Sequence, residues 1–300
     1  MAHAHAPCSL DFENASIPVF ESGVAEPYTR PETGYVPGAA GSDEYREREL
    51  RAFCCRLFGW GDEVADVVDD RMHTVLTAAR QGTPIALRGE SDLVPVAHAL
   101  HRRLFGPDAP FVVCDPQRRH SDGAGRWQPN RITGRLALDA AIGGSVCVRA
   151  KSLPPDFLAL ATSFREAGSL AMLFVCLHDR DPIRDVLCPP VDIPSLAERA
   201  SDHERLLDEY LRDAAKTLGV RRVRLAPHLR ESILRDVESL ADLENTTLRV
   251  VAIASARSVA QAATRLHMAS VSLSRWVGRR RWITSFLCEE REYADETDVQ

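Results

Sequence analysis

Short apolar runs alternate with longer amphipathic segments between residues 84 and 177. The runs have the length and composition of buried strands, and helix-period segments separate two pairs of them. Strands that alternate with helices form a parallel sheet covered on both faces, so the pattern predicts an α/β domain. The predicted strands are residues 84–88, 110–114, 144–148 and 170–177, and the predicted helices are residues 92–105 and 155–166.

The flanking segments have other patterns. Residues 1–42 are rich in proline, glycine, alanine and serine without a regular period, which predicts a disordered tail. Two helices are predicted before the first strand, one beginning near Ser42 as its cap and one over residues 62–80. The polar residues 118–131 are predicted to form a loop. The remaining helices are predicted at residues 196–218, 226–237, 239–254, 258–266 and 270–277.

Composition narrows the class of protein. The chain has 300 residues, 45% of them hydrophobic, and a formal net charge of −6, which disfavours a protein that coats nucleic acid without specificity. It has no apolar run of the roughly 18 residues that a membrane span needs. Its first residues lack the basic and apolar regions of a secretory signal. We therefore expect a cytoplasmic protein with no membrane partner.

Cysteine and histidine spacing gives no metal site. The eight cysteines include no Cys-x-x-Cys pair, and we expect reduced thiols that serve as small apolar residues. His98 and His101 are three residues apart on a predicted helix, but no third ligand accompanies them. Asp179 and Asp181 are expected on a solvated loop rather than in a catalytic pair.

The average charge hides a local asymmetry. No aspartate or glutamate occurs from Thr246 to Leu287, although this stretch contains seven arginines. A cation-rich segment on an acidic chain is typical of proteins with a polyanionic partner. The arginines are Arg249, Arg257, Arg265, Arg275, Arg279, Arg280 and Arg281.

The segment from Ser258 to Val277 predicts a helix-turn-helix. Its first helix contains the small pair Ala262 and Ala263, which lets a second helix approach closely. The second helix would be capped by Ser270 and would contact a DNA groove or phosphates. The expected shared core is Leu266, Val271, Leu273 and Trp276; the expected DNA contacts are Ser270, Ser272, Ser274 and Arg275, with Arg279, Arg280 and Arg281 at the backbone. A helical hairpin with solvated arginines is the alternative interpretation.

This segment resembles the Fis-type helix-turn-helix that closes bacterial enhancer-binding proteins, the sigma-54-dependent activators. The resemblance rests on Ala262-Ala263, Leu266, Met268, Ser270 and Leu273. His267 stands where that family usually has glycine, a residue that tolerates positive φ more readily than histidine does.

Residues 84–245 resemble the AAA+ ATPase domain of the same family, with the blocks in the same order. Residues 87–91 resemble the start of its phosphate-binding loop, 143–148 resemble the approach to Walker B, and 193–199 are the closest match. The resemblance implies an AAA+-like parallel sheet with helices on both faces at 43–190, a lid-like helical subdomain at 191–245, a helix-turn-helix domain at 246–287 and an acidic tail at 288–300.

The residues that would bind and hydrolyse nucleotide are missing from this pattern. After Gly89 the loop continues with Glu90 and Ser91 and has neither a second glycine nor a lysine. Pro95 removes an amide donor, and Asp92 adds negative charge. Arg149 and Ala150 stand at the Walker B acids, Leu177-His178 replaces the polar sensor, and Ala241 replaces the sensor arginine. The sigma-factor contact loop has no match at 123–128, and Arg184 and Arg199 are expected to form surface salt bridges.

We therefore predict a DNA-binding transcriptional regulator with a catalytically inactive AAA+-like domain, not an enzyme, without cofactor or metal. The expected partners are double-stranded DNA and a second copy of the chain, as a homodimer or higher oligomer. An alternative is a pseudo-ATPase interaction module that modulates an intact AAA+ partner. A second alternative is an active ATPase with a divergent site.

Overall fold

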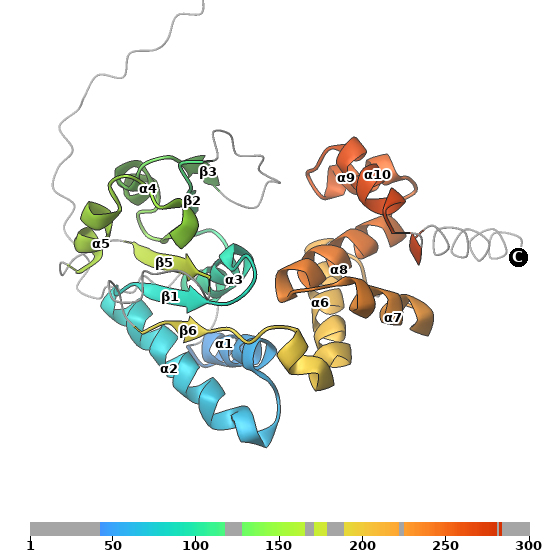
Figure 1. The fold of residues 1–300 in the computed structure, drawn as a ribbon, viewed down its shortest axis with the longest axis horizontal. Helices are drawn as coiled ribbons and strands as arrows, with labels where there is room; N and C mark the ends of the chain where they lie inside the picture. The colour runs from blue at the N-terminus through green and yellow to red at the C-terminus, as the bar shows by residue number, and fades with distance from the viewer. Residues whose placement is uncertain are drawn as a thin grey trace, which may run out of the picture.

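The computed structural model describes residues 43–117, 128–165, 171–178, 189–221, 225–280 and 282–283. A six-stranded sheet lies on one side of the molecule and a group of helices on the other (Figure 1). The strand order is β3-β2-β4-β5-β1-β6, and every pair is parallel. The strands are β1 (Ile85–Arg88), β2 (Phe111–Cys114), β3 (Gln128–Arg131), β4 (Ser145–Arg149), β5 (Met172–Leu177) and β6 (Val191–Asp192).

Successive strand residues pack into two separate cores, one on each face of the sheet. Ile85, Leu87 and Phe174 belong to the core shared with helices α1 (Asp43–Phe58), α2 (Ala65–Gln81) and α3 (Val94–Phe105). Ala86 and Val175, their neighbours in sequence, belong to the core shared with α4 (Gly134–Ala140) and α5 (Phe157–Arg165). Alternation of buried side chains between faces requires apolar residues at consecutive positions, which is why the strands read as unbroken apolar runs. The predicted α/β class with helices on both faces is confirmed.

Two strands differ from the sequence prediction. The predicted loop over residues 118–131 ends in β3, since residues 128–131 pair with β2; residues 118–127 lie outside the described residues. The second is β6, within the stretch expected to be helical from residue 191. It pairs with β1 through Leu87 and Val191, and an ion pair joins Arg88 to Asp192.

The helical portion follows β6 and lies beside the sheet domain (Figure 1). Its most extensive helix packing is between α6 (His203–Thr217) and α8 (Leu240–Ala254), and α7 (Pro227–Asp236) packs on both. Leu206, Leu207 and Leu211 give α6 a buried face at helical spacing. Its opposite side carries charges that bind α1, where buried Arg56 pairs with Asp213 and, at 3.1 Å, with Glu209. Leu87 of the sheet and Leu207 of α6 also belong to one cluster of buried apolar residues, so the two portions share a core instead of being joined only by a linker.

Arg199 departs from two expectations. The helix predicted over residues 196–218 is interrupted, because Arg199 has non-helical φ −119° and ψ 34° inside the 3₁₀ segment η3 (Ala197–Asp202). Its side chain is 4% exposed, so it is not a surface salt-bridge former. The guanidinium donates to the Arg56 carbonyl and to Asp202 Oδ2, the latter at 2.9 Å from Nη2. Arg199 thus joins α1 to the start of α6. Arg184 lies outside the described residues.

The described residues also bear on the apolar and thiol predictions. Among them, no helix is both long and apolar enough to cross a bilayer. Cys54, Cys114, Cys147 and Cys176 are buried free thiols, as expected. The tails at 1–42 and 288–300 lie outside the described residues, and so does the predicted cap Ser42.

Candidate nucleic-acid interface and phosphate-loop region

Two short helices follow α8 near the end of the described part of the chain (Figure 1). Helix α9 (Val259–Arg265) begins after Ser258, whose hydroxyl accepts a hydrogen bond from the Gln261 amide at 3.1 Å. Helix α10 (Ser270–Gly278) packs against it. Ala262 and Ala263 are almost fully buried, as expected for small residues that allow two helices to approach closely.

The turn between α9 and α10 depends on a left-handed residue. His267 has φ +52°, and among the residues that the structure describes it is the one non-glycine with positive φ. The turn is closed by hydrogen bonds from the His267 amide to Thr264 O and from the Met268 amide to Ala263 O, both 3.0 Å. The left-handed position is therefore the one at which the resembled family carries glycine.

Helix α10 has one buried and one exposed side. Leu273, Trp276 and Val277 are buried against the helical core. The exposed side chains include all the predicted base contacts, which are Ser270, Ser272, Ser274 and Arg275, together with Arg279. The second helix therefore has a free face to present, although contact with DNA itself remains a prediction.

Two predictions about α10 were wrong. Val271 was expected in the shared core, but its side chain is 65% exposed, because the buried residues 273, 276 and 277 place position 271 on the opposite side of the helix. Ser270 was expected to cap the helix. The cap residue is instead Ala269, with no side-chain cap bond, so Ser270 is the first residue inside the helix.

The arginines of this region divide into exposed and packed groups. Arg257, Arg275 and Arg279 are exposed. Arg280 is half-buried, with its guanidinium carbon 4.6 Å from the centre of the Trp276 ring. Arg249 packs on the same ring, and burial together with the charge of Arg280 lowers the pKa of Arg249. Arg281 lies outside the described residues.

Arg265 attaches the helix pair to the rest of the molecule. Its Nη1 donates to Ser255 O at 3.0 Å and to Ser255 Oγ at 2.7 Å, and its Nη2 donates to Leu218 O at 2.5 Å. Leu218 follows the last turn of α6, so one side chain joins α9 to the ends of both α8 and α6. This arginine has a structural role and is not available to DNA.

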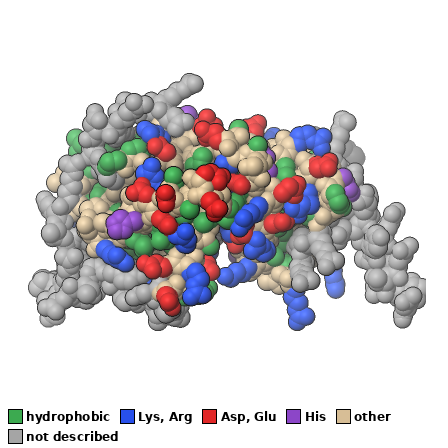
Figure 2. Space-filling model, turned by 90° about the horizontal axis from the view of Figure 1, so that it is seen from below, with side chains coloured by type: hydrophobic (Ala, Val, Ile, Leu, Met, Phe, Trp, Pro, Cys, Tyr) green, Lys and Arg blue, Asp and Glu red, His purple; other side chains and the backbone are tan. Residues whose placement is uncertain are grey.

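The surface on the other side of the molecule has a different charge distribution. Figure 2 views the molecule from below the orientation of Figure 1, and acidic and basic side chains are interspersed over that face. By contrast, the segment that forms α9 and α10 contains arginines without a single acidic residue.

The phosphate-loop region lies at the carboxyl ends of the parallel strands. Residues 89–93 join β1 to α3, and the amide of Val94 in the first turn of α3 donates to Asp92 Oδ1 at 3.3 Å. A helix N-terminus attracts anions because its amides and its dipole are positive there. In this chain the anion at that terminus is the carboxylate of Asp92.

The cation next to that carboxylate is the Arg149 guanidinium. Arg149 ends β4 and is 5% exposed; its Nη2 and Nε lie 2.9 and 3.2 Å from the two carboxylate oxygens of Asp92. Its Nη1 lies 3.2 Å from Oδ2 of the buried Asp115, which also accepts from Ser152 Oγ. Burial alone would lower the pKa of Arg149, but the hydrogen bonds and charge of Asp92 outweigh it and raise that pKa. The guanidinium is therefore held charged between two carboxylates.

Asp115 and Ser152 were not predicted as parts of this region. A signal was present, because Asp115 directly follows β2 and Arg149 ends the adjacent β4. The carboxyl ends of parallel strands meet at one edge of the sheet, so side chains at these two positions are brought together. Glu90 and Ser91, by contrast, lie where the sequence placed them, at the end of β1.

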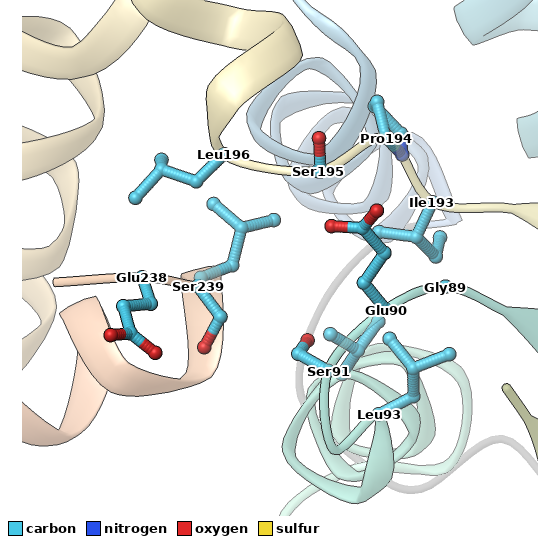
Figure 3. A pocket seen from close by; sticks show the side chains of 12 residues that line it. Gly89, Glu90, Ser91, Leu93, Ile193, Pro194, Ser195, Leu196, Glu238 and Ser239 are labelled. Atoms are coloured by element: carbon cyan, nitrogen blue, oxygen red, sulfur yellow. The ribbon is translucent and has the colours of Figure 1, made fainter.

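A narrow cleft lies between the loop after β1, the segment after β6 and the start of α8 (Figure 3). Glu90 extends toward Pro194 and Ser195, and Glu238 and Ser239 lie across the cleft. The cavity volume is about 20 Å³, close to the space of one water, whereas small-molecule sites occupy roughly 300–1,000 Å³. A nucleotide would have to displace these side chains and meet the carboxylate of Glu90.

The remaining candidates have structural surroundings. His101 is 1% exposed, with Nδ1 2.6 Å from Ser145 Oγ and Nε2 3.1 Å from Ala109 O. Burial lowers its pKa to about 4. Ala241 is buried in α8, and Asp179 and Asp181 lie outside the described residues. No cluster of three metal-ligating side chains occurs within the ranges that the structure describes.

Comparison with solved structures finds 26 matching chains, two of which are structures of NtrX. NtrX from Brucella abortus in complex with ADP has a TM-score of 0.43 and 16% identity over 70% of this chain and 54% of its own. NtrX from the same organism in complex with ATP has a TM-score of 0.40 and 14% identity over 78% of this chain and 72% of its own. The chain spans about half the length of the first of these structures. No protein-family model matches the chain, and no curated protein matches it in sequence.

Proposed function

We propose that this chain is a DNA-binding transcriptional regulator that acts without ATP hydrolysis. The observation that carries the proposal is the free face of α10, which exposes three serines and the arginines Arg275 and Arg279. Serine hydroxyls and arginine guanidinium groups are suited to base edges and phosphates, and a helix of this size enters the major groove. The segment that contributes this face, residues 246–287, contains no acidic residue of its own, which favours a polyanionic partner.

The α/β domain supports the second half of the proposal. Asp92 occupies the helix N-terminus that would receive a phosphate, and Arg149 occupies the neighbouring position where a catalytic site needs metal-binding acids. The Asp92 carboxylate would repel an anionic phosphate, and the Arg149 guanidinium already pairs with both Asp92 and Asp115, so it occupies the place of a divalent cation. We therefore expect the domain to serve as an assembly or ligand-sensing platform in a homodimer or higher oligomer.

The test has two measurements on the full chain. The first measures affinity for labelled random-sequence duplexes and for enriched duplexes over a series of salt concentrations. We expect binding that weakens as salt rises, because released counterions set the slope. The second measures phosphate release from ATP with magnesium. Turnover above background would contradict the inactive domain, and affinity that ignores salt would contradict the DNA interface.

An interaction module for an intact AAA+ partner is the second candidate function. Three exposed aliphatic side chains favour it, since they lie in or next to neighbouring helices α4 and α5 and have no polar role. They are Leu136 at 51%, Ile142 at 54% and Leu158 at 72% exposure. This candidate predicts that the purified chain binds a partner ATPase and leaves DNA free, so the salt series distinguishes the two.

A further inference from the structure

Val271 is an exposed aliphatic side chain on a helix face that is otherwise polar or small. It is 65% exposed, and its exposed neighbours on α10 are serines, a glycine and arginines. A single exposed valine needs no explanation by itself, because folded proteins expose many apolar atoms. What distinguishes Val271 is its position on the helix.

The buried stripe of α10 identifies the line that faces directly outward. Leu273, Trp276 and Val277 are buried, and an α-helix turns by about 100° per residue. Positions 271, 275 and 278 therefore lie roughly opposite the buried stripe, whereas positions 272 and 274 lie on its flanks. Val271 and Arg275 are therefore the side chains of α10 most nearly opposite its buried side, and Gly278 continues the line without a side chain.

The side chains at the outward positions of α10, Val271 and Arg275, match groups that the major groove of DNA presents. The thymine C5 methyl is the apolar group that this groove presents, and aliphatic side chains contact it. Arginine donates to the guanine O6 and N7. Val271 lies in the first turn of the second helix, the part that contacts base edges in helix-turn-helix proteins. A valine has no hydrogen-bonding group, so a methyl is the base-specific feature that it can recognise.

Helix geometry sets the distance between the two contacts. Four residues separate Val271 from Arg275, which corresponds to a rise of about 6 Å. Successive base pairs are about 3.4 Å apart along the duplex. We propose that Val271 contacts the methyl group of a thymine within about two base pairs of a guanine that Arg275 contacts, so that each half-site contains this pair. The inference rests on the proposed DNA binding and adds the base preference.

The experiment removes the methyl from the DNA and the aliphatic group from the protein. The full chain first enriches duplexes from a random library, and each thymine of the enriched site is then replaced by deoxyuridine, which lacks only the methyl. We expect one thymine per half-site at which the replacement weakens binding about fourfold, as burial of one methyl implies. In V271A the same replacement should have no effect.

The variant keeps the helix, because alanine favours helices more than valine and the side chain at position 271 is 65% exposed. V67A is the matched control, since Val67 is an exposed valine of α2 in the other portion of the molecule. It should retain the full deoxyuridine effect. If the deoxyuridine replacement weakens DNA binding by V271A as much as it weakens binding by the unmodified chain, this inference alone is overturned. A chain that enriches no duplex would overturn both this inference and the proposed function.

Discussion

Two nitrogens of the Arg149 guanidinium contact the two carboxylate oxygens of Asp92, at 2.9 and 3.2 Å. This pair joins the end of β4 to the loop before α3, and Asp115 extends it to the end of β2. The loop after β1 is therefore held by side chains of the chain itself. A phosphate-binding loop needs the reverse arrangement, with free amides and a mobile lysine.

Removal of this guanidinium should destabilise the fold. Arg149→Ala leaves the buried Asp115 carboxylate without its cation, and we expect a loss of about 2–4 kcal/mol in the free energy of unfolding. Arg135→Ala is the control, because Arg135 pairs with Asp139 on the surface with an 81% exposed side chain and should change stability by less than about 0.5 kcal/mol. Urea unfolding measures both. Equal stabilities for the two variants would show that the Arg149 cluster contributes nothing.

The left-handed residue of the turn predicts an order of stability. A φ of +52° strains any residue with a Cβ and strains β-branched residues most. His267→Gly should be as stable as the unmodified chain or more stable by up to about 1 kcal/mol, whereas His267→Val should be less stable by about 1–2 kcal/mol. Thermal unfolding gives the order. Thr264→Val, in α9, controls for the loss of polarity, and a valine at 267 that unfolds no earlier would contradict the strained turn.

Burial of His101 predicts a loss of stability in mild acid. The folded-state pKa is lowered to about 4 from its ordinary value of 6.5, so the folded protein favours the neutral imidazole. The stabilisation is complete above about pH 6.5 and is lost as the pH falls toward 4, because the unfolded chain takes up the proton first. When the pH falls from 7.5 to 5, His101 should lower the free energy of unfolding by about 2 kcal/mol.

The measurement is the free energy of unfolding at the two pH values. His101→Gln should remove most of this pH dependence, even if the variant is less stable at both values. His73→Gln, at an exposed position of α2, should leave it unchanged. A His101→Gln variant with the full pH dependence would assign the effect to other groups.

The exposed arginine of the outward line predicts a change in specificity. Arg275→Ala should weaken binding to the enriched duplex by about 1–3 kcal/mol and relax the preference for guanine at one position. Arg279→Ala should instead weaken binding to all sequences alike and reduce the salt slope by about one. Arg235→Ala, an exposed arginine of α7, should change neither quantity. Fluorescence anisotropy over a salt series separates these outcomes, and unchanged affinity for Arg275→Ala would remove that residue from the interface.

The apolar patterns were sufficient for the sheet and its layers, because strands that are buried on both faces are continuous apolar runs. They were not sufficient for β3, whose sequence Gln-Pro-Asn-Arg has no aliphatic or aromatic side chain apart from the proline ring. That strand is held in part by Asn130, whose side chain accepts from the Asp115 amide at 3.0 Å and donates to the Asp115 carbonyl at 2.9 Å. Side-chain contacts between residues 15 apart have no local sequence signature.

The candidate site on α10 and the loop after β1 were likewise predictable only in part. Residue type alone assigned Val271 to the core, but the rotation of α10 depends on the turn at His267 and on which residues pack on α8. The lack of a second glycine and of a lysine after Gly89 was visible in the sequence. The charges of Asp92 and Arg149 were also visible there, but their pairing with each other and with Asp115 was not predicted, because the three residues come from separate strands and loops.

The bonds of Arg265 to Ser255 and to the Leu218 carbonyl have a consequence for the operator. A helix pair on a flexible linker could reorient and bind half-sites at many separations. Here the pair is clamped at two points, so each protomer offers α10 at one angle and one distance from its sheet. A dimer of such protomers would hold its two α10 helices at a fixed separation. Insertion of about five base pairs between the half-sites, which is half a helical turn of DNA, would turn one half-site to the opposite side of the duplex.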